Sequence, residues 1–352
     1  MRRLRIKDLR NIHDETVDLH PALNVFCGRN AQGKTSLLEA VGLVARGRSF
    51  RTDDAPSMIR RGADRLLAGA DAGEGEATTQ LEVQLRPPER AFRVDGRDVP
   101  PREYHGRLEV VVYSTDRLRV VRGSMRDRRQ FLDRQAAALW PAYRADLVAF
   151  ERVLRQRNAA LEARRRDEDV WTESFVARGA RLRQRRALFA GRLTGALAAG
   201  FRPGGERYEV RVPSEAASPE AARGALADEI AAAQPRERAA GRSLAGPHRD
   251  AVELLLDGRD VAEGASSGQS RSLLLALALA SLQVYREETG RSAVALLDDL
   301  DSELDEERAG TLCAEVARRG QALVTSAHPG WAESLRPLGS IYHVSGGAVR
   351  CA

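Results

Sequence analysis

Lysine is nearly absent from this chain, and cysteine is scarce. Of the 56 lysine and arginine residues, only those at positions 7 and 34 are lysine, and all the others are arginine. The three cysteines, Cys27, Cys313 and Cys351, have no CxxC spacing, which argues against a disulfide framework or a zinc site. The longest apolar stretch, residues 273–282, is too short to span a bilayer.

A secretory signal is also lacking. The first six residues begin an alternating strand pattern without the apolar segment of a signal peptide, so we expect a cytoplasmic protein with no membrane span. A length of 352 residues allows two or three domains. The net charge of +6 and a pI near 9.6 permit nucleic-acid binding, although an ordinary solvated basic surface would give the same values.

Residues 28–35, Gly-Arg-Asn-Ala-Gln-Gly-Lys-Thr, fit the phosphate-loop pattern GxxxxGK[ST] at every fixed position. A short apolar strand is predicted before this loop and an amphipathic helix after it, a context that disfavours a chance match. Lys34 is expected to reach the β and γ phosphates of a nucleoside triphosphate, and the Thr35 hydroxyl to help hold Mg²⁺. The residues expected to contact the nucleotide are Gly28, Arg29, Asn30, Ala31, Gln32, Gly33, Lys34, Thr35 and Ser36.

A predicted hairpin near the amino terminus brings Arg10 and Asn11 to a turn ahead of the loop. Either they face the nucleotide or they form an ordinary polar turn. Farther along, the apolar run 294–297 ends in Asp298 and Asp299, as a buried parallel strand would at a nucleotide site. Together with Lys34, these two carboxylates are the predicted catalytic residues. Asp298 is expected to bind Mg²⁺ through water, and Asp299 to orient or deprotonate the attacking water.

The remaining chain divides into an antiparallel β section and a helical insertion. Strands are predicted over 81–85 and 92–94, and the second strand ends in a turn at Asp95 and Gly96. From about residue 124, helical periodicity predicts two long amphipathic limbs in an antiparallel arm. The arginine-rich face of this arm could touch DNA phosphates, or it could be a solvated outer face.

Several segments, in the expected order, make the sequence similar to a known family. The phosphate loop, a Ser-x-Gly-Gln signature at 266–269, and Ser-Glu-Leu-Asp at 302–305 after the acidic pair resemble the ABC-type ATPase heads of the SMC and Rad50 group. Within that group the chain is most similar to the RecF family of bacterial recombination mediators. The segments that carry this likeness are 9–11, 47–52, 128–133, 246–250 and 296–305.

The resemblance implies an α/β P-loop NTPase of the ABC-ATPase head type, with an antiparallel β section and an inserted helical arm. Residues 1–120 and 205–352 would form the head, and 121–204 the arm. It also implies an ATP-gated homodimer in which Ser266, Gly268 and Gln269 of one subunit close in trans on the γ phosphate held by the other. Such proteins hydrolyse ATP slowly and bind duplex or gapped DNA and single-strand/duplex junctions. With RecO and RecR they promote the loading of RecA.

The sequence departs from the family pattern at some positions. Asp116 follows Thr115 where Pro-Glu is common, and by resemblance it takes a place near Mg²⁺. Ser326 ends a predicted strand where many ABC ATPases have a switch histidine, whereas His328 is expected to be a loop residue. His248 lies in a family motif without an assigned role.

Two alternatives remain open at this point. One is the cytoplasmic subunit of an ABC transporter, although roughly 230 residues separate Lys34 from Ser266, about twice the expected spacing. The other is a structural clamp that binds ATP with negligible turnover, suggested by Asp299 in place of the usual glutamate.

Overall fold

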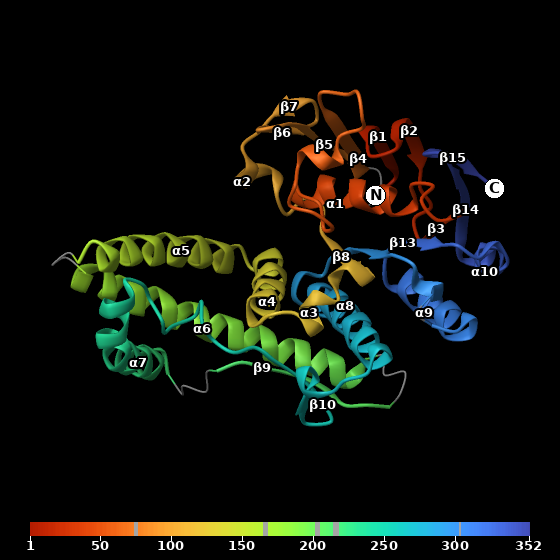
Figure 1. Cartoon of the computed structure of the whole chain (residues 1–352). Helices are drawn as coiled ribbons and strands as arrows, with labels where there is room; N and C mark the ends of the chain where they lie inside the picture. Colours follow the sequence, from red (N-terminus) through yellow and green to blue (C-terminus); the bar gives the residue numbers. More distant parts are fainter. Residues whose placement is uncertain (74–76, 165–167, 201–204, 214–217, 303) are drawn as a thin grey trace. The chain divides into compact units, whose positions relative to one another are not determined.

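The computed structural model describes residues 1–73, 77–164, 168–200, 205–213, 218–302 and 304–352. These residues form two compact units, which are coloured by sequence in Figure 1. Residues 1–117 and 290–352 form the first, called here the sheet unit, and residues 118–289 form the second, the helical unit. Among the described helices, none is both long and apolar enough to cross a membrane.

A six-stranded, mostly parallel sheet lies at the centre of the sheet unit, in the order β15-β14-β3-β13-β12-β8. Four of its strands, β3, β8, β12 and β13, are wholly buried although β8 lies at the edge, and all four were predicted from apolar runs. The parallel register aligns their carboxyl ends, which places Ser326 beside Cys27. The strands are β3 (Leu23–Cys27), β8 (Val110–Tyr113), β12 (Val294–Leu297), β13 (Ala322–Ser326), β14 (Gly339–Ser345) and β15 (Ala348–Cys351).

A second, antiparallel sheet has the order β2-β1-β4-β5-β6-β7 and packs its apolar face on helix α1 (Lys34–Arg46). The predicted turn is present between β6 and β7, with positive φ at Asp95 and Gly96. Strand β4 was not predicted, because its sequence Leu-Leu-Ala-Gly-Ala-Asp-Ala has little β propensity. The strands are β1 (Arg3–Leu9), β2 (Ile12–Asp18), β4 (Leu66–Ala72), β5 (Thr79–Arg86), β6 (Glu89–Val94) and β7 (Arg97–Asp98).

Short helices complete the sheet unit. Helix α9 begins after Asp305, whose carboxylate accepts a hydrogen bond from the Arg308 amide at 2.9 Å and so caps the helix. Asp305 ends the Ser-Glu-Leu-Asp segment, of which Glu303 lies outside the described residues. The elements are α2 (Pro101–Tyr104), α9 (Glu306–Arg319), α10 (Pro329–Ser334), and the 3₁₀ turns η1 (Pro56–Met58), η2 (Thr115–Arg117), η4 (Leu300–Ser302) and η5 (Arg336–Leu338).

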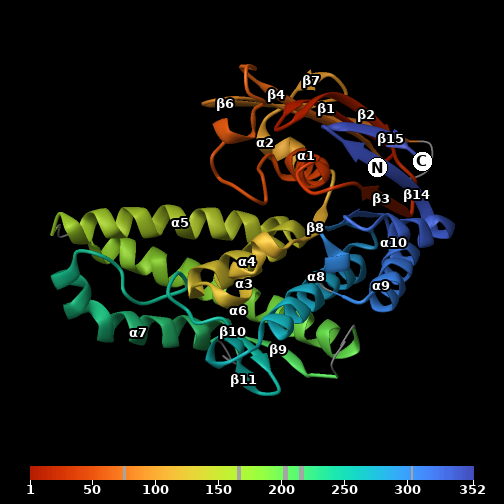
Figure 2. The same ribbon diagram turned by 45° about the vertical axis from the view of Figure 1, so that its right-hand side comes forward.

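The second predicted limb is helix α6, whereas the first, predicted from about residue 124, is divided at Trp140 into two helices, α4 and α5. Helices α5 and α6 lie side by side in both Figure 1 and Figure 2. A small sheet, β11-β10-β9, is part of the same unit. Its elements are α3 (Arg119–Arg122), α4 (Met125–Leu139), α5 (Pro141–Glu162), α6 (Glu168–Ala199), β9 (Tyr208–Arg211), α7 (Pro219–Ala240), β10 (Glu253–Leu256), β11 (Arg259–Asp260), η3 (Val261–Glu263) and α8 (Ser267–Thr289).

The compact units differ from the expected division into head and arm. Residues 205–289 were assigned to the head, but they belong to the helical unit because α7, α8 and β9 all pack on α6. Local sequence patterns did not indicate this packing, since residues 219–240 carry an alanine-rich pattern without a clear apolar face. The first boundary, near residue 118, lies close to the expected one.

Several arginines of the helical unit are buried, although its arginine-rich pattern predicted a surface. Arg128 is bidentate to Asp260, at 2.9 and 3.0 Å, and also donates to the Val252 carbonyl. Arg186 donates to both oxygens of Asp133, at 3.0 and 3.1 Å. Buried arginine must be paired, because an isolated charge cannot be desolvated at low cost. Arg186 joins α6 to α4, and Arg128 joins α4 to the small sheet, so both side chains are buried in the unit and are not available to DNA.

The segment 246–250, Gly-Pro-His-Arg-Asp, has a structural role in this unit. The single N–H at Arg183 Nε donates a bifurcated hydrogen bond to the two carboxylate oxygens of Asp250, at 2.9 and 3.1 Å. His248 lies against the rings of Phe150 and Phe175, and its Nε2 is 3.2 Å from the Ser243 carbonyl oxygen, to which it donates. The segment 246–250, which includes His248, therefore connects α6 to the loop after α7.

Candidate nucleotide-binding site

The phosphate loop joins β3 to α1, and glycine is required at both of its fixed positions. A Cβ at Gly28 would lie 2.3 Å from the Val344 carbonyl oxygen, so no larger residue fits. Gly33 has φ of 112° and precedes the first residue of α1, with the Asn11 side chain directly beside it. The loop therefore leads into a helix amino terminus whose free amides can bind an anion.

The Lys34 ammonium lies over the loop that it follows. Its Nζ donates to the carbonyl oxygens of Gly28 and Arg29, at 2.7 and 3.1 Å, and lies 3.5 Å from Asn30 Oδ1. Lys34 is 5% exposed, so the charge is held on a mostly buried stem. The ammonium group has three N–H donors, which can exchange these neutral acceptors for the oxygens of a bound phosphate.

The loop is also held from outside by two turns, one between β1 and β2 and one between β14 and β15. The amides of Gly346 and Gly347 donate to the side chain and the carbonyl of Gln32, at 2.7 and 2.9 Å. Asn11 donates from Nδ2 to the same Gln32 carbonyl at 3.0 Å. Asn11 thus lies beside the loop, where its observed contact fixes the loop backbone, and its contact with ATP remains a prediction.

Asp298 lies at the carboxyl end of β12, among three hydroxyl groups. Thr35 and Thr325 donate to its Oδ1 at 2.9 and 2.8 Å, and Ser114 donates to its Oδ2 at 3.3 Å. Burial raises the pKa of this carboxyl above its ordinary value; the hydroxyl donors oppose that shift, while the charge of Asp299 adds to it. Asp298 is thus oriented at the start of α1, with one oxygen directed to Thr35.

Asp299, the second member of the acidic pair, has a left-handed backbone. Its φ is 54°, and its amide donates to Thr325 Oγ1 at 2.8 Å. Aspartate tolerates this conformation better than most residues, but a non-glycine residue there still costs about 1–2 kcal/mol. The hydrogen bond from the Asp299 amide to Thr325 helps to hold this strained backbone conformation.

The residues around Asp298 fit a magnesium ion. Mg²⁺ prefers hard oxygen ligands and is usually held by one or two carboxylates together with substrate phosphates. The Thr35 hydroxyl and the Asp298 carboxylate supply adjacent oxygens of this kind. Over the described part of the chain, no group of three or more His, Cys, Asp or Glu side chains could hold a metal. This arrangement suits a cation whose other ligands come from phosphate and water.

Two predicted site residues make other contacts. Arg10 forms a bidentate ion pair with Glu39, both bonds 3.0 Å long, and also donates to the Ser57 carbonyl. Asp116 accepts a hydrogen bond from Arg51 Nε at 3.0 Å and is not among the partners of Asp298. The roles of Arg10 and Asp116 toward ATP and Mg²⁺ therefore remain predictions, and the structure gives each a separate ionic partner.

The end of β13 contributes Ser326 rather than a histidine. Ser326 is fully buried, and its hydroxyl donates to Asp301 and accepts from the His328 amide at 2.9 Å. The His328 side chain is exposed at the start of α10, as expected for a loop residue. Ser326 therefore occupies the strand end, with its hydroxyl oriented by a carboxylate.

Sequence reasoning did not identify Ser114 and Thr325. Both are buried hydroxyl residues at the carboxyl ends of strands that flank β12, and both bond to Asp298. The available signal was a hydroxyl residue at or just after an apolar run. That signal gains meaning only when the strand order is known, because β8 and β13 are far from β12 in sequence.

The signature residues lie in the helical unit, at the start of α8. Ser266 Oγ accepts from the Gln269 amide at 3.1 Å, and Gln269 Oε1 accepts from the Ser266 amide at 3.0 Å, which forms a reciprocal cap. Ser266 and Gly268 are exposed, and Gln269 is partly exposed. Among the described residues, a Cβ at Gly268 would meet only Ser266 Oγ, at 3.9 Å, so none of their atoms demands a glycine there.

Comparison with known proteins agrees with this geometry. The family profile "RecF/RecN/SMC N terminal domain" matches residues 1–350. The chain is 36% identical over 338 residues to the DNA replication and repair protein RecF of Symbiobacterium thermophilum, covering 92% of this chain and 90% of that protein. It is 35% identical over 357 residues to the RecF protein of Frankia alni, covering 92% of each.

Solved structures support the same fold. A structure of "the recombination mediator protein RecF-ATP in RecFOR pathway" has a TM-score of 0.90 at 23% identity, covering all of this chain and 97% of that one. A Pyrococcus furiosus Smc head domain has a TM-score of 0.57 at 12% identity, covering 99% of this chain and 95% of that one. The predicted ABC-type head fold is therefore confirmed, and the transporter alternative has no support. The chain belongs to the RecF family of DNA replication and repair proteins.

Proposed function

We propose that this protein is an ATP-dependent DNA-binding ATPase of recombinational repair and replication restart. ATP binds along residues 28–36, with Lys34 at the β and γ phosphates. The nearby Thr35 hydroxyl and Asp298 carboxylate hold Mg²⁺, which neutralises phosphate charge when bound. Asp299 accepts the proton of the attacking water or orients it. The convergence of Thr35, Thr325 and Ser114 on Asp298 is the observation that carries the ATPase assignment.

The proposal includes an ATP-gated homodimer, because the signature residues are built for an external ligand. The start of α8 is exposed to solvent and offers the Ser266 hydroxyl, the Gly268 amide and, at Gln269, the amino terminus of a helix. Groups of these kinds bind phosphate. No described residue gives a steric reason for glycine at position 268, which supports close approach by a group from a second subunit. The γ phosphate held by a second subunit is the occupant that we propose.

A bulky substitution in the signature tests the dimer. Ser266→Arg introduces a large cation where the partner's nucleotide would lie, so we expect ATP-dependent dimerisation to be lost while the monomer still binds ATP. The matched control is Ala227→Arg, at an exposed position on α7 of the same unit. Light scattering with and without ATP measures both. A normal ATP-dependent dimer in Ser266→Arg would rule out the assignment in trans.

DNA is the proposed macromolecular ligand, and the helical arm is a candidate surface for it. Arg152, Arg155, Arg178 and Arg181 are exposed on α5 and α6, whereas the buried arginines of the same unit are structural. Exposed guanidinium groups bind phosphates and release counterions, which makes binding salt-dependent. We propose that the DNA ligands are duplex DNA, gapped DNA and single-strand/duplex junctions. We further propose that the protein acts in the cytoplasm with RecO and RecR to promote the loading of RecA.

A DNA titration tests this role. Duplex, single-stranded and gapped oligonucleotides are compared with and without ATP at several salt concentrations. We expect ATP to tighten binding to duplex-containing substrates. Arg152→Glu with Arg155→Glu should reduce the salt slope by about one for each phosphate that is no longer neutralised. Binding that is equal on all substrates and insensitive to ATP would contradict the proposal.

A clamp with negligible turnover is the second candidate, favoured by the short side chain at Asp299. The clamp would have the same nucleotide site and the same dimer as the ATPase. The two candidates differ only in whether Asp299 takes part in ATP hydrolysis. Comparing ATP hydrolysis by the wild type and by Asp299→Asn separates the two.

A further inference from the structure

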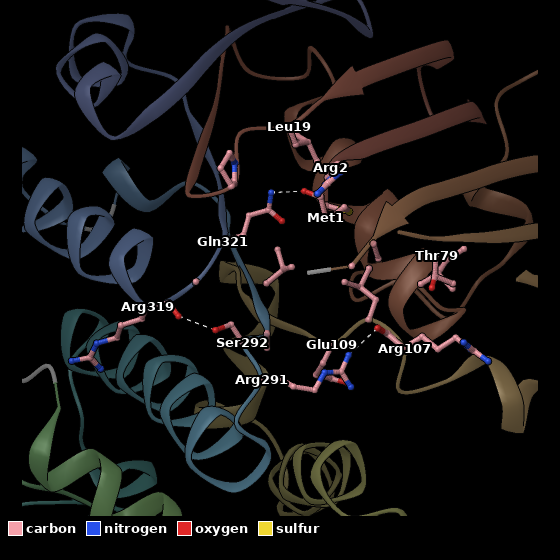
Figure 3. Close-up of a pocket in the computed structure, with 18 of the residues that line it drawn as sticks. Met1, Arg2, Leu19, Thr79, Arg107, Glu109, Arg291, Ser292, Arg319 and Gln321 are labelled. Carbon is pink, nitrogen blue, oxygen red and sulfur yellow. Dashed lines mark hydrogen bonds between the residues drawn. The ribbon is translucent and has the colours of Figure 1, made fainter. Parts of the chain in front are cut away.

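A large cavity lies in the sheet unit at the end opposite the phosphate loop. It has a volume of about 1040 Å³ and is drawn in Figure 3. Glu109, Ala293 and Gln321, which line it, immediately precede β8, β12 and β13. The acidic pair and Ser326 lie at the other ends of these strands. The cavity is thus separate from the nucleotide site and as large as a typical ligand-binding pocket.

The cavity is basic. Its described lining contains five arginines and one acidic residue, Glu109, whose carboxylate accepts a hydrogen bond from Arg46 at 2.9 Å. In Figure 3 the side chains of Arg107 and Arg319 lie on opposite sides of the cavity and point outward from its rim. Arg319 is paired with Glu315, which reduces its contribution to the charge. The arginines of the lining are Arg2, Arg107, Arg291, Arg318 and Arg319.

The rim is held in place by bonds to the backbone. Arg291 donates to the carbonyl oxygens of Gly106 and Arg107, at 3.5 and 3.2 Å, and Ser292 donates to the Arg319 carbonyl at 2.9 Å (Figure 3). These bonds connect the segments before β8, before β12 and after α9. The cavity is therefore a connected feature of the fold.

Gln321 provides a second, independent indication of a ligand. It is 7% exposed, and its Nε2 donates to the carbonyl oxygens of Met1 and His20, at 2.7 and 2.8 Å. Its Oε1 is buried without a hydrogen-bond partner, and in Figure 3 it faces the cavity. A buried acceptor without a partner is costly, so a donor from a bound molecule would be stabilising.

We propose that this cavity docks an extended acidic segment of a partner protein that also carries an apolar side chain. Its carboxylates would meet the arginine rim, a backbone N–H would reach Gln321 Oε1, and the apolar side chain would contact Leu19, Leu81 and Leu108. Charge complementarity and the apolar lining select such a peptide.

A single nucleic-acid strand fits the lining less well. Sites for single strands combine basic residues with aromatic platforms on which bases stack. None of the described lining residues is aromatic. The basic charge is therefore better matched to carboxylates on a flexible apolar chain than to a stack of bases.

Fluorescence anisotropy with the full-length protein tests the proposal. The probe is a fluorescein-labelled peptide in which glutamate alternates with leucine, and a second peptide has glutamine in place of each glutamate. We expect the acidic peptide to bind, salt to weaken it, and the glutamine peptide to bind about tenfold more weakly or less. Neither oligothymidylate nor ATP should displace the acidic peptide.

Variants locate the binding. Arg107→Glu with Arg318→Glu should weaken the peptide about tenfold or more, because both side chains are exposed at the rim. Arg107→Gln with Arg318→Gln is the milder second variant. Arg350→Glu, at an exposed position of the same unit outside the lining, should change nothing. Equal losses in rim and control variants, displacement by oligothymidylate or ATP, or equal binding of the glutamine peptide would overturn the proposal.

Discussion

Asp299→Asn separates chemistry from binding at the proposed ATPase site. The replacement removes one negative charge and keeps the size of the side chain. Asparagine also tolerates the left-handed backbone conformation, so we expect the φ of 54° and the hydrogen bond from the backbone amide of residue 299 to Thr325 to be preserved. Alanine would be a poorer choice, because it would add backbone strain to the loss of the carboxylate.

The expected loss follows from the role of the carboxylate. A positioned general base contributes about 10²–10⁴-fold to a reaction, which corresponds to about 2.7–5.4 kcal/mol of activation free energy. ATP binding should be unchanged or tighter, since Asp299→Asn removes a like charge beside both Asp298 and the triphosphate. Hydrolysis should therefore fall at least a hundredfold while the affinity for ATP does not fall.

Single-turnover hydrolysis of radiolabelled ATP measures the chemical step, and a fluorescent ATP analogue measures binding. Asp305→Asn is the matched control, because it makes the same chemical change at the cap of α9, where asparagine caps as well as aspartate. Rates of wild type and Asp299→Asn within about twofold of each other would refute a role in general-base catalysis. That result would favour the clamp with negligible turnover.

Lys34→Arg should retain some nucleotide binding but lower phosphate release about a hundredfold, because a planar guanidinium cannot replace a compact donor; undiminished turnover would contradict this role. Arg157→Met should destabilise the helical unit by about 3–5 kcal/mol in urea, since it leaves Glu237, 2.6 Å away and fully buried, without its counter-charge; combining it with Glu237→Gln should cost less than the sum of the single changes. Burial lowers the pKa of His248, so the folded protein binds fewer protons than the unfolded chain below the ordinary value of 6.5. Stability should therefore be complete above that pH and decline as the pH falls toward the folded pKa, and His248→Gln should flatten this decline in melting temperature; parallel curves would exclude His248 as its source.

Structural features that depend on a single continuous stretch of the chain could be predicted from the sequence. Buried strands appear as apolar runs, and the loop at 28–35 has a fixed spacing, so both could be identified locally. Asp298 could be assigned because an acidic residue directly follows such a strand.

Features that depend on distant pairing could not be predicted. Ser114 and Thr325 join the site only because β8 and β13 flank β12. The ion pair between Arg10 and Glu39 links a hairpin turn to α1. Likewise, an arginine such as Arg128 looks like a surface residue in sequence, and only the packing of its carboxylate partner allows it to be buried.

The connections between the two units have a mechanical consequence. The chain enters the helical unit after residue 117, just beyond the carboxyl end of β8, and leaves it at residue 289, just before the amino end of β12. These strands are parallel neighbours, so their opposite ends are about 13 Å apart for four residues. The helical unit is therefore tethered at two points, one beside Asp298 and its hydroxyl partners and one beside the basic cavity.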